Sequence, residues 1–85
     1  MTSSAPDEDP RAVELRISDD ELVVVLADAR RISVPLAWFP RLLGATPAER
    51  RKFEFVGGGV GIHWPEIDED LSVDGLLRGV RPSRR

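Results

Sequence analysis

The sequence predicts a small α+β domain, with a mainly antiparallel sheet of about five strands and short helices on one face. Three observations support this class. Short segments alternate apolar and polar residues, tight turns rich in Asp, Ser or Gly separate them, and helix-capping residues occur elsewhere. The predicted order of elements is β-β-β-α-α-β-β-α. A chain of 85 residues has room for one such domain.

The first three predicted strands form an antiparallel meander. Residues 12–17 alternate apolar and charged side chains, as a strand with one buried face does. Residues 21–27 are apolar on both faces, which is typical of a central strand. Residues 31–34 form the third strand, which ends at Pro35. The intervening segments contain Asp and Ser, whose side chains hydrogen-bond to nearby backbone in turns.

Two short helices are predicted next. Residues 36–43 have apolar side chains at helical spacing, with Gly44 after the last turn. Pro40 must lie in the first turn of this helix, because deeper in the helix it would remove a backbone hydrogen bond. Thr46 and Glu49 have the spacing of a capping box, which predicts a second helix that begins just after Thr46.

Two further strands and a helix complete the predicted domain. Residues 53–56 and 60–64 alternate, and the glycines at 57–59 form the turn between them. Ser72 is the predicted N-cap of the last helix, and Gly79 ends it.

The folded domain is expected over residues 12–79. Residues 1–11 are rich in Ser, Asp, Glu and Pro and are predicted to be a disordered acidic segment, and residues 80–85 a basic tail. The sequence begins without the basic and apolar regions of a secretory signal, and no apolar run is long enough to span a bilayer. A cytoplasmic location without a membrane partner is therefore expected.

Composition narrows the function classes. The formal net charge of −3 argues against a general nucleic-acid-binding protein, which needs a strongly basic face. The chain has no cysteine, which excludes disulfides, a thiolate nucleophile and cysteine-ligated zinc.

Two motifs resemble ligand sites, and neither satisfies the chemistry of its site. The acidic run at 66–70 fits the opening of a calcium loop, but Leu71 and Leu77 stand where glycine and a bidentate glutamate are needed. Carboxylates placed before the Ser72 helix suit its dipole instead. The glycines at 57–61 lack the following helix and lysine of a phosphate-binding loop, so a glycine-rich hairpin is expected.

His63 is the only histidine and therefore the natural candidate for a general base. Ser33 or Ser72 would be its nucleophilic partner, but no spacing supports such a set. We therefore interpret His63 as an outward-facing or hydrogen-bonded structural residue. No catalytic residue, metal site or cofactor is predicted, and an enzyme is not expected.

The aromatic residues are expected to serve mainly the core, because each buries a large apolar area. Phe53, Phe55 and Trp64 are predicted core residues. Trp38 is left open between the core and a partner-binding surface.

Two segments resemble a signature of the bacterial family known as domain of unknown function 2442. They are residues 31–42 and residues 61–79, and the resemblance extends over about the whole predicted domain. It implies a small α+β fold and no known catalytic or ligand residue. Some members look like a domain joined to a repressor-type helix-turn-helix. Others look like stand-alone chains encoded beside another small protein, an arrangement similar to toxin–antitoxin pairs.

The leading hypothesis is a non-enzymatic interaction or regulatory module, the antitoxin-like member of a two-gene pair. Its partner is expected to be a small protein encoded nearby or a second copy of the chain. An aromatic anchor rimmed by charge is the predicted contact surface. Its residues are Trp38, Phe39, Arg41, Leu42, Asp68, Glu69 and Asp70.

The alternative is a DNA-associated regulator or accessory domain that lacks a helix-turn-helix, because the sequence after Gly79 leaves no room for one. It would use Arg50, Arg51, Lys52 and the C-terminal arginines against phosphates.

Overall fold

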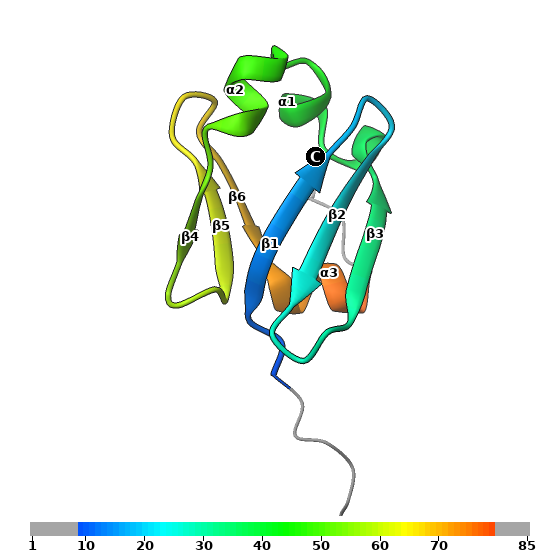
Figure 1. Ribbon diagram of the computed structural model, residues 1–85. Helices are drawn as coiled ribbons and strands as arrows, with labels where there is room; N and C mark the ends of the chain where they lie inside the picture. The colour runs from blue at the N-terminus through cyan, green and yellow to red at the C-terminus, as the bar shows by residue number, and fades with distance from the viewer. Residues whose placement is uncertain (1–8, 80–85) are drawn as a thin grey trace, which may run out of the picture.

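The computed structural model describes residues 9–79 and confirms the α+β class. Its strands form two three-stranded antiparallel sheets, in the orders β1-β2-β3 and β4-β5-β6. The prediction of a single sheet is therefore wrong, because the helices after β3 carry the chain away to a second sheet (Figure 1). Residues 1–8 of the acidic segment predicted over residues 1–11, and the predicted basic tail over residues 80–85, lie outside the described residues.

The first sheet is the predicted meander of β1 (Ala12–Ile17), β2 (Glu21–Leu26) and β3 (Arg31–Pro35). Alternate residues of β2 point to opposite faces. The inward set is fully buried: Leu22, Val24 and Leu26. Ser18 closes the β1–β2 turn, since its Oγ accepts hydrogen bonds from the backbone N–H groups of Asp20 and Glu21. Asp9, in the predicted acidic segment, donates its backbone N–H to Asp28 Oδ2 in the next turn.

The second sheet consists of β4 (Glu54–Val56), β5 (Gly61–Trp64) and β6 (Glu69–Ser72). The sequence analysis did not predict β6 and assigned its first residues to an acidic loop. Leu71 is the buried apolar residue of β6 and pairs with Ile62 of β5. The strand forms because this one side chain joins the core while its polar neighbours face outward or lie at the sheet's end.

The predicted helix over residues 36–43 is divided at Phe39 into a 3₁₀ turn, η1 (Leu36–Trp38), and a short helix, α1 (Pro40–Leu43). Phe39 has φ −124° and ψ 87°, outside the helical region. A proline disfavours the helical conformation of the residue before it and lacks an N–H group, so Pro40 begins a new helix instead of continuing the first.

Both predicted N-caps are confirmed. In α2 (Pro47–Arg51), Thr46 Oγ1 accepts from the N–H of Glu49, and the Glu49 carboxylate accepts from the N–H of Thr46. In α3 (Val73–Arg78), Ser72 Oγ accepts from the N–H of Gly75. Gly79 ends α3 in the left-handed conformation, with φ 74°.

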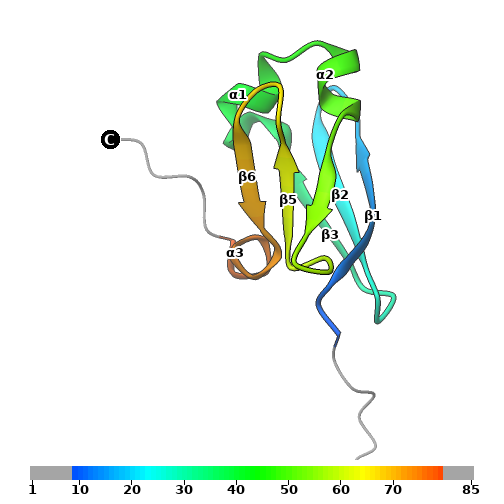
Figure 2. The same ribbon diagram turned by 90° about the vertical axis from the view of Figure 1, so that its left-hand side faces the viewer.

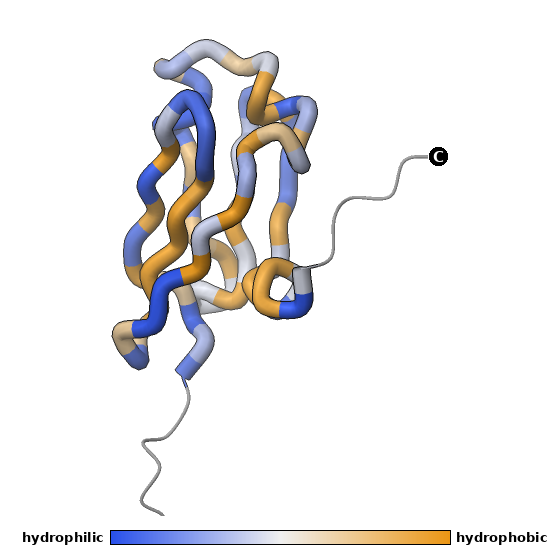
Figure 3. The backbone as a smooth tube through the Cα atoms, turned by 90° about the vertical axis from the view of Figure 1, so that its right-hand side faces the viewer, coloured by the Kyte–Doolittle hydropathy of each residue, from blue (hydrophilic) through white to orange (hydrophobic). Residues whose placement is uncertain are grey.

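The core lies between the two sheets, with α1 and α2 over one end and α3 over the other (Figures 1 and 2). The helices therefore cover the two ends of the core. The prediction that they cover one face of a single sheet is wrong. Coloured by hydropathy, the backbone shows apolar residues alternating with polar ones along the strands (Figure 3). The buried residues come from both sheets, η1, α1 and α3: Ala12, Leu15, Leu22, Val24, Leu26, Val34, Leu36, Phe39, Leu42, Ile62, Trp64, Leu71, Val73 and Leu76.

The predicted core aromatics divide into one central and two peripheral residues. Trp64 is fully buried, and its indole N–H donates to the carbonyl oxygen of Arg50 at 3.0 Å, which satisfies its polar group. Phe53 and Phe55 are partly buried and pack against the core. Their rings meet edge to face, with centroids 5.5 Å apart.

Candidate functional site

The structure brings together two of the segments predicted to form a contact surface. Arg41 on α1 donates a hydrogen bond from Nη1 to the backbone carbonyl oxygen of Asp68, which lies 27 residues further along the chain. The same nitrogen lies 3.9 Å from the Asp68 carboxylate. Asp68 has φ 53°, a left-handed conformation that Asp tolerates better than most residues. This contact fixes α1 against the β5–β6 turn.

Two predicted contact residues are buried in the core. Phe39 is 1% exposed and Leu42 is 0% exposed, so neither presents a side chain to a partner. With Leu36 they form a series at spacing of three residues, which is the pattern of a buried stripe. Trp38 is half-buried and meets the Phe39 ring edge to face, with centroids 6.5 Å apart. Trp38 is therefore the aromatic residue of this segment that reaches the surface.

Leu43, which was not among the predicted contact residues, is 47% exposed at the end of α1. Its position just before Gly44, at the helix terminus, was the available signal. We define the α1 surface as the half-buried or exposed side chains of η1 and α1, Trp38, Arg41 and Leu43, together with Asp68 of the β5–β6 turn. Arg41 and Leu43 are two residues apart and therefore lie on different sides of α1.

The predicted acidic residues 68–70 point in different directions because strand β6 alternates. Glu69 pairs with buried Trp64 and shares its inward face. Burial raises the pKa of Glu69, and Arg41 opposes this effect. Asp70 faces outward, where its Oδ1 lies 2.6 Å from Nδ1 of His63. The three carboxylates therefore do not form one acidic patch.

His63 faces outward on the second sheet and is paired with Asp70, which matches the outward-facing, hydrogen-bonded placement expected from the sequence. The hydroxyl oxygens of both serines considered as nucleophiles make hydrogen bonds to groups other than His63. Ser72 Oγ accepts from the N–H of Gly75 at 2.9 Å, and Ser33 Oγ donates to Glu21 at 2.6 Å on the other sheet. Among residues 9–79, no group of three or more His, Cys, Asp or Glu side chains is placed to hold a metal ion.

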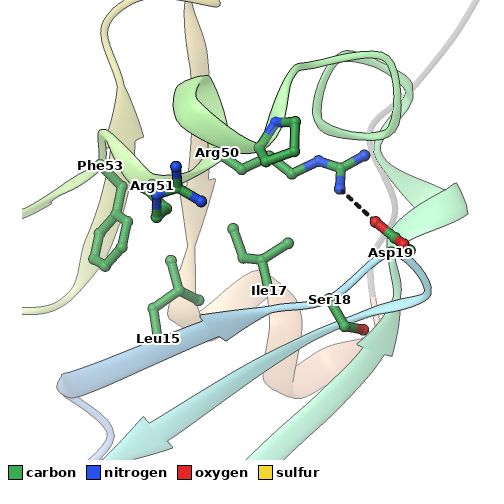
Figure 4. A pocket seen from close by; sticks show the side chains of 8 residues that line it. Leu15, Ile17, Ser18, Asp19, Arg50, Arg51 and Phe53 are labelled. Atoms are coloured by element: carbon green, nitrogen blue, oxygen red, sulfur yellow. Dashed lines mark hydrogen bonds and ion pairs between the residues drawn. The ribbon is translucent and has the colours of Figure 1, made fainter.

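A cleft that the sequence did not reveal opens between β1 and α2 (Figure 4). Its volume is about 190 Å³. Leu15 and Ile17 of β1 point across it toward Arg51 and Phe53 (Figure 4). The complete lining is Leu15, Ile17, Ser18, Asp19, Pro47, Arg50, Arg51 and Phe53. The cleft thus combines an apolar floor with a cationic rim.

The three consecutive cations of the α2 region have different roles. Arg50 is only 12% exposed, and its guanidinium donates to the carbonyl oxygens of Leu42 and Leu43 at 2.9 Å each. Lys52 Nζ pairs with Glu66 at 3.0 Å. Arg51 is exposed and has no hydrogen bond or ion pair in the described part of the chain. Of the three, Arg51 is the one whose charge is unpaired among residues 9–79.

A family model described as "Protein of unknown function (DUF2442)" matches residues 12–82. The chain belongs to this family. The match covers the whole predicted domain, residues 12–79, and confirms the resemblance carried by residues 31–42 and 61–79. No curated protein sequence matches the chain. No helix within residues 9–79 is long and apolar enough to cross a membrane.

Two solved structures resemble this DUF2442 chain. A protein of unknown function from Rhodospirillum rubrum has a TM-score of 0.76 and 29% sequence identity, over 92% of this chain and 95% of that one. An uncharacterized protein from Chromobacterium violaceum has a TM-score of 0.72 and 28% identity, over 86% of this chain and 69% of that one. Both likenesses support the fold.

Proposed function

We propose that this DUF2442 chain is a non-enzymatic regulatory module that binds another protein through the α1 surface. The observation that carries the proposal is the contact between Arg41 and Asp68, because it holds α1 against a charged turn. Protein interfaces combine apolar anchors with a polar rim. Trp38 and Leu43 provide the anchors, and the Arg41–Asp68 pair provides part of the rim.

The proposed partner is a small protein encoded by a neighbouring gene. In this pair, the DUF2442 chain is the antitoxin-like member. The family resemblance supports this assignment. The function requires a stable complex rather than turnover of a substrate, and the α1 surface offers a contact of that kind.

The proposal is tested by co-expressing the tagged chain with the product of the neighbouring gene. Leu43→Glu and Arg41→Glu should each abolish co-purification. The first places a charge at an apolar position of the contact surface, and the second reverses the charge of the arginine. The matched controls lie on α3, at the other end of the domain: Leu77 is 40% exposed, and exposed Arg78 pairs with Asp74. Leu77→Glu and Arg78→Glu should leave the complex intact.

Failure to recover the neighbouring protein with the native chain would overturn the proposed function, as would equal losses in α1 and α3 variants. The antitoxin-like role has its own readout. The neighbouring gene expressed alone should arrest growth, and co-expression of this chain should restore it unless Leu43→Glu is present.

The alternative, a DNA-associated regulator, has less support from the described residues. Arg50 and Lys52 are engaged within the fold, which leaves Arg51 of the three consecutive cations, and the C-terminal arginines lie outside the described residues. Duplex-DNA binding measured at low salt and again at about 150 mM tests this alternative, since phosphate contacts weaken steeply with salt. Absence of binding at low salt would eliminate it.

A further inference from the structure

The cleft lies beside two strands that are each at the edge of a sheet. Within residues 9–79, β1 pairs only with β2, and β4 pairs only with β5. The two edges are joined at one end, where the N–H of Ala12 donates to the carbonyl oxygen of Gly59 at 2.7 Å. Toward Ile17 and Arg51 the edges are separated by the cleft (Figure 4). The seam between the sheets is thus closed at the start of β1 and open near its end.

The free edge of β1 presents unpaired backbone groups to this opening. The N–H of Ser18 donates to the carbonyl oxygen of Glu21, so these two residues form a hydrogen-bonded pair of the antiparallel ladder. Hydrogen-bonded and non-hydrogen-bonded pairs alternate along such a ladder. Leu15 and Ile17 pair with Val24 and Leu22 at the intervening positions. Their N–H and C=O groups therefore point away from β2, toward the free edge.

The charges of the lining favour an acidic occupant. The lining contains Arg50, Arg51 and Asp19, which is one positive charge in excess. The Asp19 carboxylate lies 3.3 Å from the Arg50 guanidinium, so the charges of these two residues cancel. Arg51 remains beside the apolar side chains of Leu15 and Ile17 (Figure 4).

We infer that the cleft binds an extended segment of a partner protein, which adds as a strand to the edge of β1. Successive side chains of a strand alternate between faces, so residues two positions apart enter the cleft together. The segment carries an apolar residue that contacts Leu15, Ile17 and Phe53, and a carboxylate two positions away that pairs with Arg51. This mode of recognition combines main-chain hydrogen bonds with side-chain pockets. It deepens the proposed protein-binding function with a second surface and does not use the α1 surface.

The probe is a fluorescent peptide in which threonine occupies every second position. It contains one valine and one glutamate, two positions apart. A second peptide has lysine in place of the glutamate. With the full chain at about 150 mM salt, where exposed charges are screened, the glutamate peptide should bind at least tenfold more tightly. Its addition should shift the backbone amide NMR signals of Leu15 and Ile17. The same signals should not move with the lysine peptide.

Arg51→Glu should weaken binding of the glutamate peptide at least tenfold, or about 1.4 kcal/mol, and should reverse the preference between the peptides. Arg31→Glu is the matched control, because Arg31 is an exposed arginine on β3 that also lacks a partner within residues 9–79. It should leave binding unchanged. Both substitutions are at exposed positions, and the NMR spectrum reports whether each variant is folded.

Three results would overturn this inference: no binding of the glutamate peptide, an equal loss in Arg31→Glu, or amide shifts confined to the α1 surface. A dimer of the free chain that dissociates in Arg51→Glu would also overturn it, because a second copy would then occupy the cleft. None of these outcomes bears on co-purification through Leu43 and Arg41, so this inference and the proposed function fail separately.

Discussion

The backbone N–H of Ala12 donates to the carbonyl oxygen of Gly59, and this bond joins the first strand of one sheet to the β4–β5 turn of the other. Gly59 has φ 110°, a conformation that side chains with a Cβ rarely adopt. A Cβ at Gly59 would lie 2.6 Å from the carbonyl oxygen of Ala12. The absence of a side chain at Gly59 therefore permits this close approach between β1 and the β4–β5 turn.

Gly59→Ala should destabilise the protein strongly. The unfavourable φ alone costs on the order of 1–3 kcal/mol, and β1 must also move to relieve the backbone clash. Gly58→Ala is the control, because Gly58 also has positive φ but open space around the position of a Cβ. Urea unfolding should show a larger loss for Gly59→Ala than for Gly58→Ala. Equal losses would contradict a role for the close approach to Ala12.

The single-sheet prediction failed because alternation identifies strands but not their partners across helices. The hairpin partners were predictable, since short turns join them. Strand β6 was missed because Glu69 and Asp70 have low strand propensity, and only Leu71 contributes a buried apolar side chain. Its pairing with β5 is a tertiary effect. The capping box at Thr46 was predictable because it depends on residues within one helical turn.

The candidate contact surface was predictable only in part. The proximity of Arg41 to Asp68 follows from the fold and has no local signal. The burial of Phe39 and Leu42 was available from their three-residue spacing with Leu36. The cleft was not predictable, because it depends on the spacing between two sheets that the sequence did not separate.

Thr46→Ala should destabilise the protein by about 1 kcal/mol, the usual effect of removing an N-cap side chain. The substitution removes the acceptor for the Glu49 N–H at the start of α2. Thr46→Ser retains the hydroxyl and should stay within about 0.5 kcal/mol of the native chain. Urea unfolding followed by tryptophan fluorescence measures both values. A Thr46→Ser variant as unstable as Thr46→Ala would show that the methyl group, not the hydrogen bond, stabilises this turn.

Asp28 should make stability depend on pH in the acidic range. Hydrogen bonds from the Arg30 side chain and from the Asp9 N–H lower the pKa of Asp28 from 3.8 to about 2. Because the folded-state pKa is below the unfolded value, the ionised carboxylate stabilises the fold above pH 3.8, and this contribution disappears as the pH falls toward 2.

Asp28→Asn should therefore be less stable than the native chain at pH 7, and the difference should shrink between pH 3.8 and pH 2. Unfolding by urea at several pH values measures this difference. Asp20→Asn, in the β1–β2 turn, is the control for replacing a turn aspartate and should be as stable as the native chain at pH 7, because no partner of the exposed Asp20 carboxylate is present in the described residues. A constant difference between Asp28→Asn and the native chain across the range would contradict the prediction.

Arg50 and Arg51 are adjacent and chemically identical, yet substitution by methionine should affect the free energy of unfolding at Arg50 and peptide binding at Arg51. Arg50 satisfies the carbonyl oxygens of Leu42 and Leu43 at the end of α1, and its side chain is only 12% exposed. Arg50→Met keeps much of the apolar stem but leaves the Leu43 carbonyl oxygen without this donor, whereas the Leu42 carbonyl oxygen still accepts from the N–H of Ala45. Each unsatisfied polar group costs about 1–3 kcal/mol when it is buried, so a loss of at least about 1 kcal/mol is expected.

Arg51→Met should change the free energy of unfolding by less than about 0.5 kcal/mol, because Arg51 is exposed and lacks a partner within residues 9–79. The same substitution should weaken binding of the glutamate peptide, whose carboxylate then has no cation to pair with. Urea unfolding and peptide titration of both variants therefore separate the two functions of neighbouring residues. An Arg51→Met variant that lost stability as Arg50→Met does would place Arg51 in the fold rather than in the recognition cleft.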